Sequence, residues 1–393
     1  MEKYISVDLL KKLKHCFLFF TICILSNQTI AQTPQFDWVQ NSYTSFRSNA
    51  KSVAADTQGN VFYAGEFASV VDFDPGPGNT ILTNIYYPVS SANGYIAKLD
   101  TNGNFLWAHS ILTDIQVSIN DMKLDAQGNI YIMGSAINQT QNLYYNNDTL
   151  DSIYGAFFMK LDNNGNFIWI KTLDYQSPFP PIFNYFVIDD LDNIYLTGNF
   201  IGTVDFNFGT GVNNLFASDV SNFVLKININ GEFIWVKNIG LSINAVFANS
   251  SLVQVNLDGI DAFYIIGKNA AGCDIDPDTS TYILNYAMDF LAKFDSAGHF
   301  LWVNQYNNIK PNYAAIDTNG EVYCIGYFNG TVDFDADTTT YLKSAIGSND
   351  IFILKLTDNG ALEWVKTIGS VQNDNGQRAL LQNDQSVIIS GVF

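Results

Sequence analysis

Four acidic segments recur along the chain, and their side chains are the best placed in the sequence for chemistry. Each segment carries Asp or Asn at alternate positions: Asp72 and Asp74; Asp205 and Asn207; Asp274, Asp276 and Asp278; Asp333, Asp335 and Asp337. Alternate side chains of an extended segment project to one side, and together they offer the oxygen ligands that Ca²⁺ prefers. The segments lack the glycine and glutamate of an EF-hand loop, and the same side chains could instead cap backbone N–H groups at a strand end. Calcium binding and capping are therefore the two alternatives for these residues.

Residues that could support catalysis are few. Beyond residue 31 the histidines are His109 and His299; one follows a tryptophan and the other precedes one, so they occupy different positions and do not form a metal pair. The sequence has no Gly-x-Gly-x-x-Gly segment, Walker loop, Gly-x-Ser-x-Gly elbow or paired-cysteine motif. We assign no catalytic residue and no cofactor apart from the calcium alternative, and the sequence favours a protein without enzymatic activity.

The tryptophans mark an internal repeat. They stand at Trp38, Trp107, Trp169, Trp235, Trp302 and Trp364, with separations of 69, 62, 66, 67 and 62 residues. A lysine lies nine residues before each of the last five: Lys98, Lys160, Lys226, Lys293 and Lys355. An aromatic residue precedes each lysine by three, and Gly65, Gly198, Gly267 and Gly326 are each followed by an Asp seven residues later. Three spacings in register indicate a repeated structural unit, in which the tryptophans have a structural role. We expect each lysine stem to pack between units, with its ammonium at an Asp or a carbonyl.

Each unit has the pattern of two β-hairpins. In the first unit, Ser52–Asp56 alternates and a turn leads to Val61–Phe67, which is rich in aromatic and β-branched residues. A second hairpin joins Tyr95–Leu99 to Phe105–Ala108. The turns share the pattern Asp-x-x-Gly, in which the Asp side chain can accept a backbone N–H and the glycine tolerates a positive φ.

Repeated four-stranded units with apolar strands predict an all-β protein, a β-propeller of four-stranded blades with a repeat of about 65 residues. The repeat domain spans 32–393, with five complete blades at about 48–110, 117–173, 182–239, 250–305 and 311–367 and a partial sixth at 376–393. A parallel β-helix is the alternative solenoid. Because the sixth blade ends after two strands, we expect the sequence to be a fragment of a longer protein. The channel-lining strands are expected to carry mainly small or apolar residues, such as Val53, Ala54, Val253, Val255, Ala314 and Ile316.

The segments Asn60–Phe67 and Val71–Asp74 resemble the secreted bacterial β-propeller repeat proteins called SBBP-type. The stretch Lys98–Trp107 is similar to the tryptophan-docking motif of quinoprotein-like propellers, with its Asp one residue out of step. The first resemblance implies an exported protein of bacteria that use type IX secretion. The second implies a tryptophan ring packed between blades, and it implies no quinone cofactor.

Composition and the N-terminus indicate the compartment. The chain has 393 residues, 47% of them hydrophobic and 15% charged, so it can bury a core and is not a disordered chain. Its net charge of −19 argues against nucleic acid or an anionic membrane as a partner. Residues 1–31 have the basic patch, apolar run and small-residue end of a signal peptide cleaved after Ala31. No later segment could span a bilayer, and Cys273 and Cys324 are expected to be buried, unpaired thiols, with a single bridge as the alternative.

These observations predict a non-catalytic, secreted or cell-surface scaffold or binding module whose partner is an extracellular protein or glycan. Two alternatives stay open: an extracellular propeller enzyme acting on polysaccharide as a hydrolase or lyase, and a repeat segment of a large adhesin. The first alternative requires acids from different blades to meet near the axis.

Overall fold

The computed structural model contains strands and turns, and the part of the chain that it describes has no helix, which confirms the all-β class. It describes residues 43–44, 48–74, 76–84, 92–177, 179–239, 241–242, 251–257, 262–269, 271–336, 339–381 and 386–392. All of these belong to one compact unit, Asn41–Phe393. The proposed signal segment, Trp38 and Asp337 lie outside the described residues. Within the described residues, no helix is long and apolar enough to cross a membrane.

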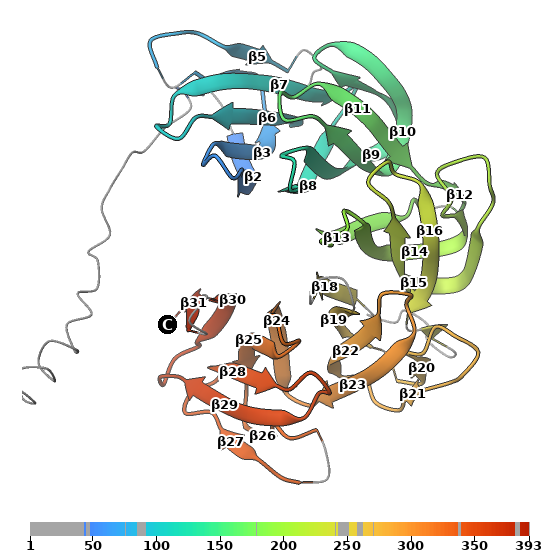
Figure 1. Cartoon of the computed structure of the whole chain (residues 1–393), viewed down its shortest axis with the longest axis vertical. Helices are drawn as coiled ribbons and strands as arrows, with labels where there is room; N and C mark the ends of the chain where they lie inside the picture. The colour runs from blue at the N-terminus through green and yellow to red at the C-terminus, as the bar shows by residue number, and fades with distance from the viewer. Residues whose placement is uncertain are drawn as a thin grey trace, which may run out of the picture. The chain divides into compact units, whose positions relative to one another are not determined.

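Antiparallel four-strand meanders follow one another along the chain (Figure 1). They comprise β2 (Ser48–Ala55), β3 (Val61–Phe67), β6 (Asn93–Leu99) and β7 (Phe105–Thr113); β8 (Val117–Leu124), β9 (Ile130–Tyr145), β10 (Asp148–Leu161) and β11 (Phe167–Thr172); β13 (Ile182–Ile188), β14 (Ile194–Asp205), β15 (Asn214–Ile227) and β16 (Phe233–Ile239); β18 (Ser251–Leu257), β19 (Ala262–Lys268), β22 (Asp289–Asp295) and β23 (Phe300–Tyr306); and β24 (Ile309–Ile316), β25 (Val322–Phe328), β28 (Asp350–Leu356) and β29 (Leu362–Ile368). A hairpin of β30 (Asn375–Leu381) and β31 (Val387–Val392) comes last.

Short strands lie at the outer ends of the meanders, and some of them tie neighbouring meanders together. They are β1 (Tyr43–Thr44), β4 (Val70–Asp72), β5 (Ile81–Thr83), β12 (Asp174–Gln176), β17 (Leu241–Ser242), β20 (Cys273–Asp274), β21 (Ile283–Leu284), β26 (Thr331–Asp333) and β27 (Leu342–Ser344). The strand that follows β11 pairs with β14, and the strand that follows β16 pairs with β20. The end of β7 pairs in the same way with β9, which merges the first two meanders into one eight-stranded sheet.

The first strand of each meander, together with β30, forms a set that we call the inner strands. In chain order they are β2, β8, β13, β18, β24 and β30, and each one contacts the next (Figure 1). Successive meanders therefore pack face to face along this row. This arrangement is propeller-like, as the repeat pattern predicts.

Both faces of a meander are buried, and adjacent residues of one strand pack against different neighbouring strands. On β14, Leu196 belongs to an apolar cluster shared with β9, β10 and β13, whereas Tyr195 belongs to a cluster shared with β19. At the first of these interfaces the rings of Phe158 and Phe186 lie 4.9 Å apart, edge to face. This explains why the strands are nearly continuous apolar runs and do not alternate cleanly.

Every inner strand carries a β-bulge at the same position. The pairing register with the second strand shifts by one residue in all six, just before Ser52, Asp121, Tyr185, Gln254, Tyr313 and Arg378. The repeated glycine of the second strand lies opposite the bulge. A Cβ on Gly326 would lie 1.9 Å from the Lys310 carbonyl oxygen, and one on Gly65 would lie 1.9 Å from the Asn49 oxygen. The repeated glycine is thus required by the close approach of a bulged backbone.

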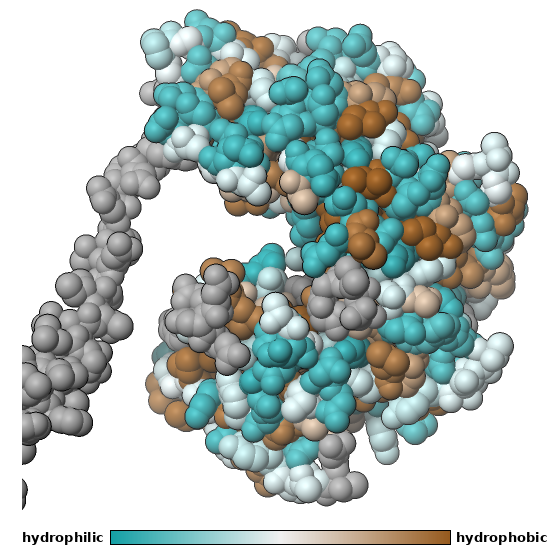
Figure 2. All heavy atoms as spheres, in the orientation of Figure 1, coloured by the Kyte–Doolittle hydropathy of each residue, from teal (hydrophilic) through white to brown (hydrophobic). Residues whose placement is uncertain are grey.

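A second bulge lies on the outermost strands of the five meanders, next to the repeated lysine. The residue left without a register partner is Leu106, Ile168, Ile234, Leu301 or Glu363. The four apolar ones are exposed, and on the face seen in Figure 2 apolar residues are interspersed with hydrophilic ones. A bulged edge is a poor template for another strand, so these outer edges resist strand-to-strand association.

Candidate functional site

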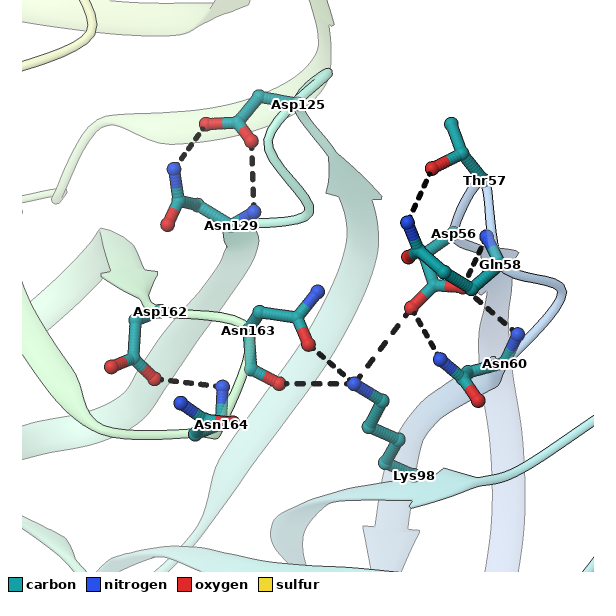
Figure 3. A network of polar contacts seen from close by, with 10 residues as sticks. All are labelled: Asp56, Thr57, Gln58, Asn60, Lys98, Asp125, Asn129, Asp162, Asn163 and Asn164. Atoms are coloured by element: carbon teal, nitrogen blue, oxygen red, sulfur yellow. Dashed lines mark hydrogen bonds and ion pairs between the residues drawn. The ribbon is translucent and has the colours of Figure 1, made fainter.

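The repeated lysines connect one meander to the next. Lys98 is buried, and its Nζ donates to the carbonyl oxygen of Asn163 at 3.3 Å and to the side-chain oxygen of the same residue (Figure 3). Its other neighbour is the Asp56 carboxylate, 3.7 Å away, which also accepts the backbone N–H groups of Gln58 and Asn60. The ammonium therefore joins a turn of its own meander to a turn of the following one.

Three of the other lysines also bind the following meander. Lys160 donates to the Ile229 carbonyl at 3.1 Å, Lys226 donates to the Ser296 carbonyl at 3.2 Å, and Lys293 binds Asp358. In all five meanders, the lysine ammonium also lies over an aromatic ring at the start of the meander's second strand, at 4.5 to 5.3 Å from the ring centroid. These rings belong to Phe62, Tyr131, Tyr195, Tyr264 and Tyr323. The expectation of buried stems with ammonium groups at an Asp or a carbonyl is confirmed for these four lysines.

Lys355, in the last meander, has acidic partners of its own. Its Nζ lies 2.6 Å from Glu321 and 2.7 Å from Glu363. Burial lowers the pKa of Lys355, but the hydrogen bonds to the two glutamates outweigh it and raise the pKa above the usual range. This lysine is therefore held by its own meander.

The described tryptophans lie beside these lysines, and Trp107, Trp235 and Trp302 contact the following meander. Trp302 donates its indole N–H to the Asp358 carbonyl at 3.0 Å, and a Cβ on Gly360 would lie 2.9 Å from its ring. Trp235 makes the matching bond to Ser296 at 3.3 Å. The indole nitrogen of Trp169 is buried and has no hydrogen-bond partner among the described residues. Glycine in the receiving turn leaves room for the ring, and it also adopts a positive φ there (+85° at Gly360).

The acidic segments bind their own backbone. Asp72 Oδ1 accepts the N–H groups of Asp74 at 3.1 Å and Thr80 at 2.9 Å. Equivalent pairs of bonds reach Asp205, Asp274 and Asp333, and the second acid or amide of three segments caps another N–H: Asp74, Asn207 and Asp276. Asp278 forms an ion pair with Lys237 at 2.6 Å, and Thr339 donates to Asp335. Among the described residues, no group of three or more His, Cys, Asp or Glu side chains is arranged to hold a metal ion. The geometry supports the capping alternative, and calcium stays an untested prediction.

The second unit replaces the acidic segment by a tight hairpin. Strands β9 and β10 continue to Tyr145 and Asp148, and the two residues of the turn, Asn146 and Asn147, have φ of 50° and 70°. Two positive φ values are the signature of the hairpin turn that matches strand twist, and Asn tolerates them. This explains why the acidic pattern is missing from this unit.

The histidines and cysteines have structural surroundings. His109 stacks on Trp107 and lies 3.1 Å from the Gly165 carbonyl, whereas His299 is exposed and pairs with Asp295 at 2.8 Å. Burial lowers the pKa of His109. Cys273 and Cys324 are free and buried, as expected.

A cavity of about 660 Å³ opens among the inner strands, and its polar lining was missed by the sequence reasoning. Strands β2, β8, β13 and β30 line it, with Lys51, Asp121, Lys123, Tyr185 and Arg378 among the lining side chains. The expectation of mainly small or apolar side chains is wrong at this cavity. Val53 and Ala54 do line it, but Ala314 is fully buried within the packed sheets. The residue after each bulge could have indicated this polar lining. A bulge changes the direction in which the next side chains point, and the residue at this position is polar or aromatic in all six inner strands.

Part of the cavity lining forms a polar network around Asp121. Lys123 Nζ lies 3.0 Å from Asp121 Oδ2 and 4.8 Å from the centre of the Tyr185 ring. Asp121 Oδ1 accepts the Ser52 hydroxyl at 3.0 Å. On β30, the Arg378 guanidinium lies over the ring of Tyr313 of β24, at 5.1 Å from the ring centroid.

Comparisons with known proteins support the fold. No family model matches the chain. The chain is similar to an uncharacterized WD repeat-containing protein, L264, of Acanthamoeba polyphaga mimivirus. The two are 24% identical over an alignment of 419 residues, gaps included, and the alignment covers 87% of this chain. It spans only 30% of the length of that curated relative.

Solved structures that overlap with the chain include two with low TM-scores. Sqt1 from Chaetomium thermophilum is 10% identical, with 91% of this chain and 97% of that chain covered and a TM-score of 0.35. The V. cholerae biofilm matrix protein Bap1 is 13% identical, with 88% and 64% covered and a TM-score of 0.21. The repeated meanders, the row of inner strands and the WD-repeat relative together support a β-propeller-like repeat protein.

Proposed function

We propose that the protein is a non-catalytic β-propeller that acts as a scaffold or binding module. One observation carries this proposal: the repeated Lys, Trp and Asp side chains are used in contacts within and between meanders. A repeat whose shared residues serve structure leaves its other positions for recognition. The residue after the bulge is one of these positions, since its type differs between most of the inner strands. The WD-repeat relative is consistent with a module that binds partners.

The finer architecture and the compartment belong to the same proposal. The five meanders are five four-stranded blades, and β30 and β31 are the first two strands of a sixth. Residues 1–31 direct export and are cleaved after Ala31, which places the protein outside the cell, free or on the surface, as in SBBP-type proteins. The partner is an extracellular protein or glycan.

A binding screen with a turnover control tests the proposal. The protein released by its native cell is applied to arrays of glycans and of surface proteins, and the same sample is incubated with the polysaccharides that bind. The proposal expects retention of at least one class without release of sugar fragments. Fragment release that is abolished by an Asp121→Ala change would instead establish the polysaccharide-degrading alternative.

A further inference from the structure

We propose that the cavity among the inner strands binds an acidic saccharide, with its carboxylate held by Lys51, Lys123 and Arg378. This inference rests on the proposed binding function and names the ligand class and the site. Three cationic side chains and one carboxylate, that of Asp121, are among the residues that line the cavity. The whole chain has 19 basic against 38 acidic residues, so a cationic lining runs against its overall charge. A positive site inside an acidic protein draws anions to the cavity and away from the outer surface.

Two of the three cations, Lys51 and Arg378, are held in place by groups that leave them open to a ligand. The Lys51 side chain is 41% exposed, and its nearest carboxylate, Glu66, is 3.9 Å away. Arg378 is exposed, rests on the Tyr313 ring, and has no ion pair with the described acidic residues. An arginine stacked on an aromatic ring keeps its planar fork free for two hydrogen bonds to a carboxylate.

The remaining lining groups suit hydroxyl groups. Asp121 is used within the protein: its Oδ2 is buried and lies 3.0 Å from the Lys123 ammonium, and its Oδ1 accepts the Ser52 hydroxyl. Asn120, Asn184 and Ser52 add neutral donors and acceptors to the wall. A ligand with a carboxylate and several hydroxyl groups, which is the description of a uronic acid, satisfies both parts of the lining. A volume of about 660 Å³ accommodates two or three sugar rings.

Calorimetric titration with trigalacturonate tests the inference on the intact protein. The uncharged methyl ester of the same trisaccharide tests the need for the carboxylate, and inorganic phosphate tests whether any oxyanion suffices. We expect trigalacturonate to bind and its ester to bind at least about tenfold more weakly, since a charge-assisted hydrogen bond is lost. Lys51→Gln and Arg378→Gln should each weaken binding about tenfold. The matched control is Lys343→Gln, which removes a cation that lies over a tyrosine outside the cavity lining.

The outcomes separate this inference from the broader proposal. Equal binding of phosphate and trigalacturonate, or binding that Lys51→Gln and Arg378→Gln leave unchanged, overturns the saccharide site. If the protein is still retained on an array in that case, the binding function stands and only its location and ligand class are wrong. Thermal melting of each variant establishes that a loss of binding is not a loss of folding.

Discussion

Asp56 shows how one side chain fixes a turn and holds a neighbouring meander. Its carboxylate accepts the N–H groups of Gln58 and Asn60 and the Asn60 side-chain amide, and it faces the Lys98 ammonium. The same turn recurs at Asp100, Asp162 and Asp295. At this scale the protein uses carboxylates as acceptors for its own backbone.

Acid should destabilise the protein through these turn carboxylates. At Asp56, burial alone would raise the pKa, but hydrogen bonds from Asn60 and the charge of Lys98 leave it below the ordinary 3.8; at Asp100 hydrogen bonds from Asn104 lower the pKa. A pKa that is lower in the folded state gives stability that is complete above about 3.8 and is lost as the pH falls through the folded value. Melting followed by circular dichroism should therefore give a Tm that falls steeply below about pH 4. A Tm that rises between pH 5 and pH 3 contradicts this account.

The two buried thiols should be inert until the protein unfolds. Burial and the nearby Asp274 raise the pKa of Cys273 to about 11, and burial raises the pKa of Cys324 to about 12. The thiolate is the reactive form, so both should resist alkylation at pH 8. Iodoacetamide labelling with peptide mapping should find Cys273 and Cys324 unmodified in the native protein and modified in guanidinium. Rapid labelling of either in the native state would show that its sheet opens readily.

At the scale of elements, the repeated bulge explains two separate features. It turns the following residue of each inner strand, and it brings the strand's carbonyl against the repeated glycine. The bulge thus explains both why the glycine is required and why the cavity lining varies from strand to strand.

Gly326→Ala tests this close approach. The new Cβ would lie 1.9 Å from the Lys310 oxygen, so the strands must separate, and we expect a loss of roughly 2 to 4 kcal/mol in the free energy of unfolding. Gly330→Ala is the control, because Gly330 has a φ of +65° and open space around it; strain alone should cost about 1 kcal/mol. Denaturant titration measures both. Equal losses for the two variants would mean that backbone conformation, and not the contact, makes the glycine necessary.

The acidic segments allow a direct test of calcium. Because Asp205 already accepts two backbone N–H groups, Asp205→Ala should cost about 1 kcal/mol of stability with or without calcium. Thermal melting in chelator and in millimolar Ca²⁺ should give the same Tm. A Tm that rises with Ca²⁺ and loses that response in Asp205→Ala establishes the metal alternative.

At the scale of the whole molecule, stability comes from interfaces between successive meanders. Apolar clusters are shared by neighbouring sheets, and the buried lysines cross from one sheet to the next. Repeat proteins built this way depend on nearest-neighbour contacts.

Removal of one crossing lysine should weaken the whole molecule. Lys226 donates to Tyr195 at 2.6 Å and to Ser296 at 3.2 Å, and it lies 3.8 Å from Asp189. Lys226→Met leaves that carboxylate buried without its cation, which should cost about 3 kcal/mol. The exposed Lys366→Met is the control and should change the stability by less than about 0.5 kcal/mol. Tryptophan fluorescence and circular dichroism should still report one coincident transition; two separated transitions would show that the interface does not couple the sheets.

The sequence by itself determined the class of fold and the repeated contacts, because these depend on local patterns. Strand periodicity, Asp-x-x-Gly turns and the spacing of Trp107 and Lys98 are properties of short segments, and similar patterns recur along the chain. The burial of the thiols follows from the same apolar strands. The acidic segments were also found, although spacing alone left both capping and calcium open.

Only the tertiary structure decided what the inner strands present to the cavity. Arg378 and Lys51 are more than 300 residues apart in the chain, and no local pattern brings them together. The bulge is a second reason, because one extra residue changes which side chains face the axis and strict alternation then assigns the wrong ones. Local geometry is repeated in every unit and can be read from one of them, whereas the cavity is a property of several units packed together.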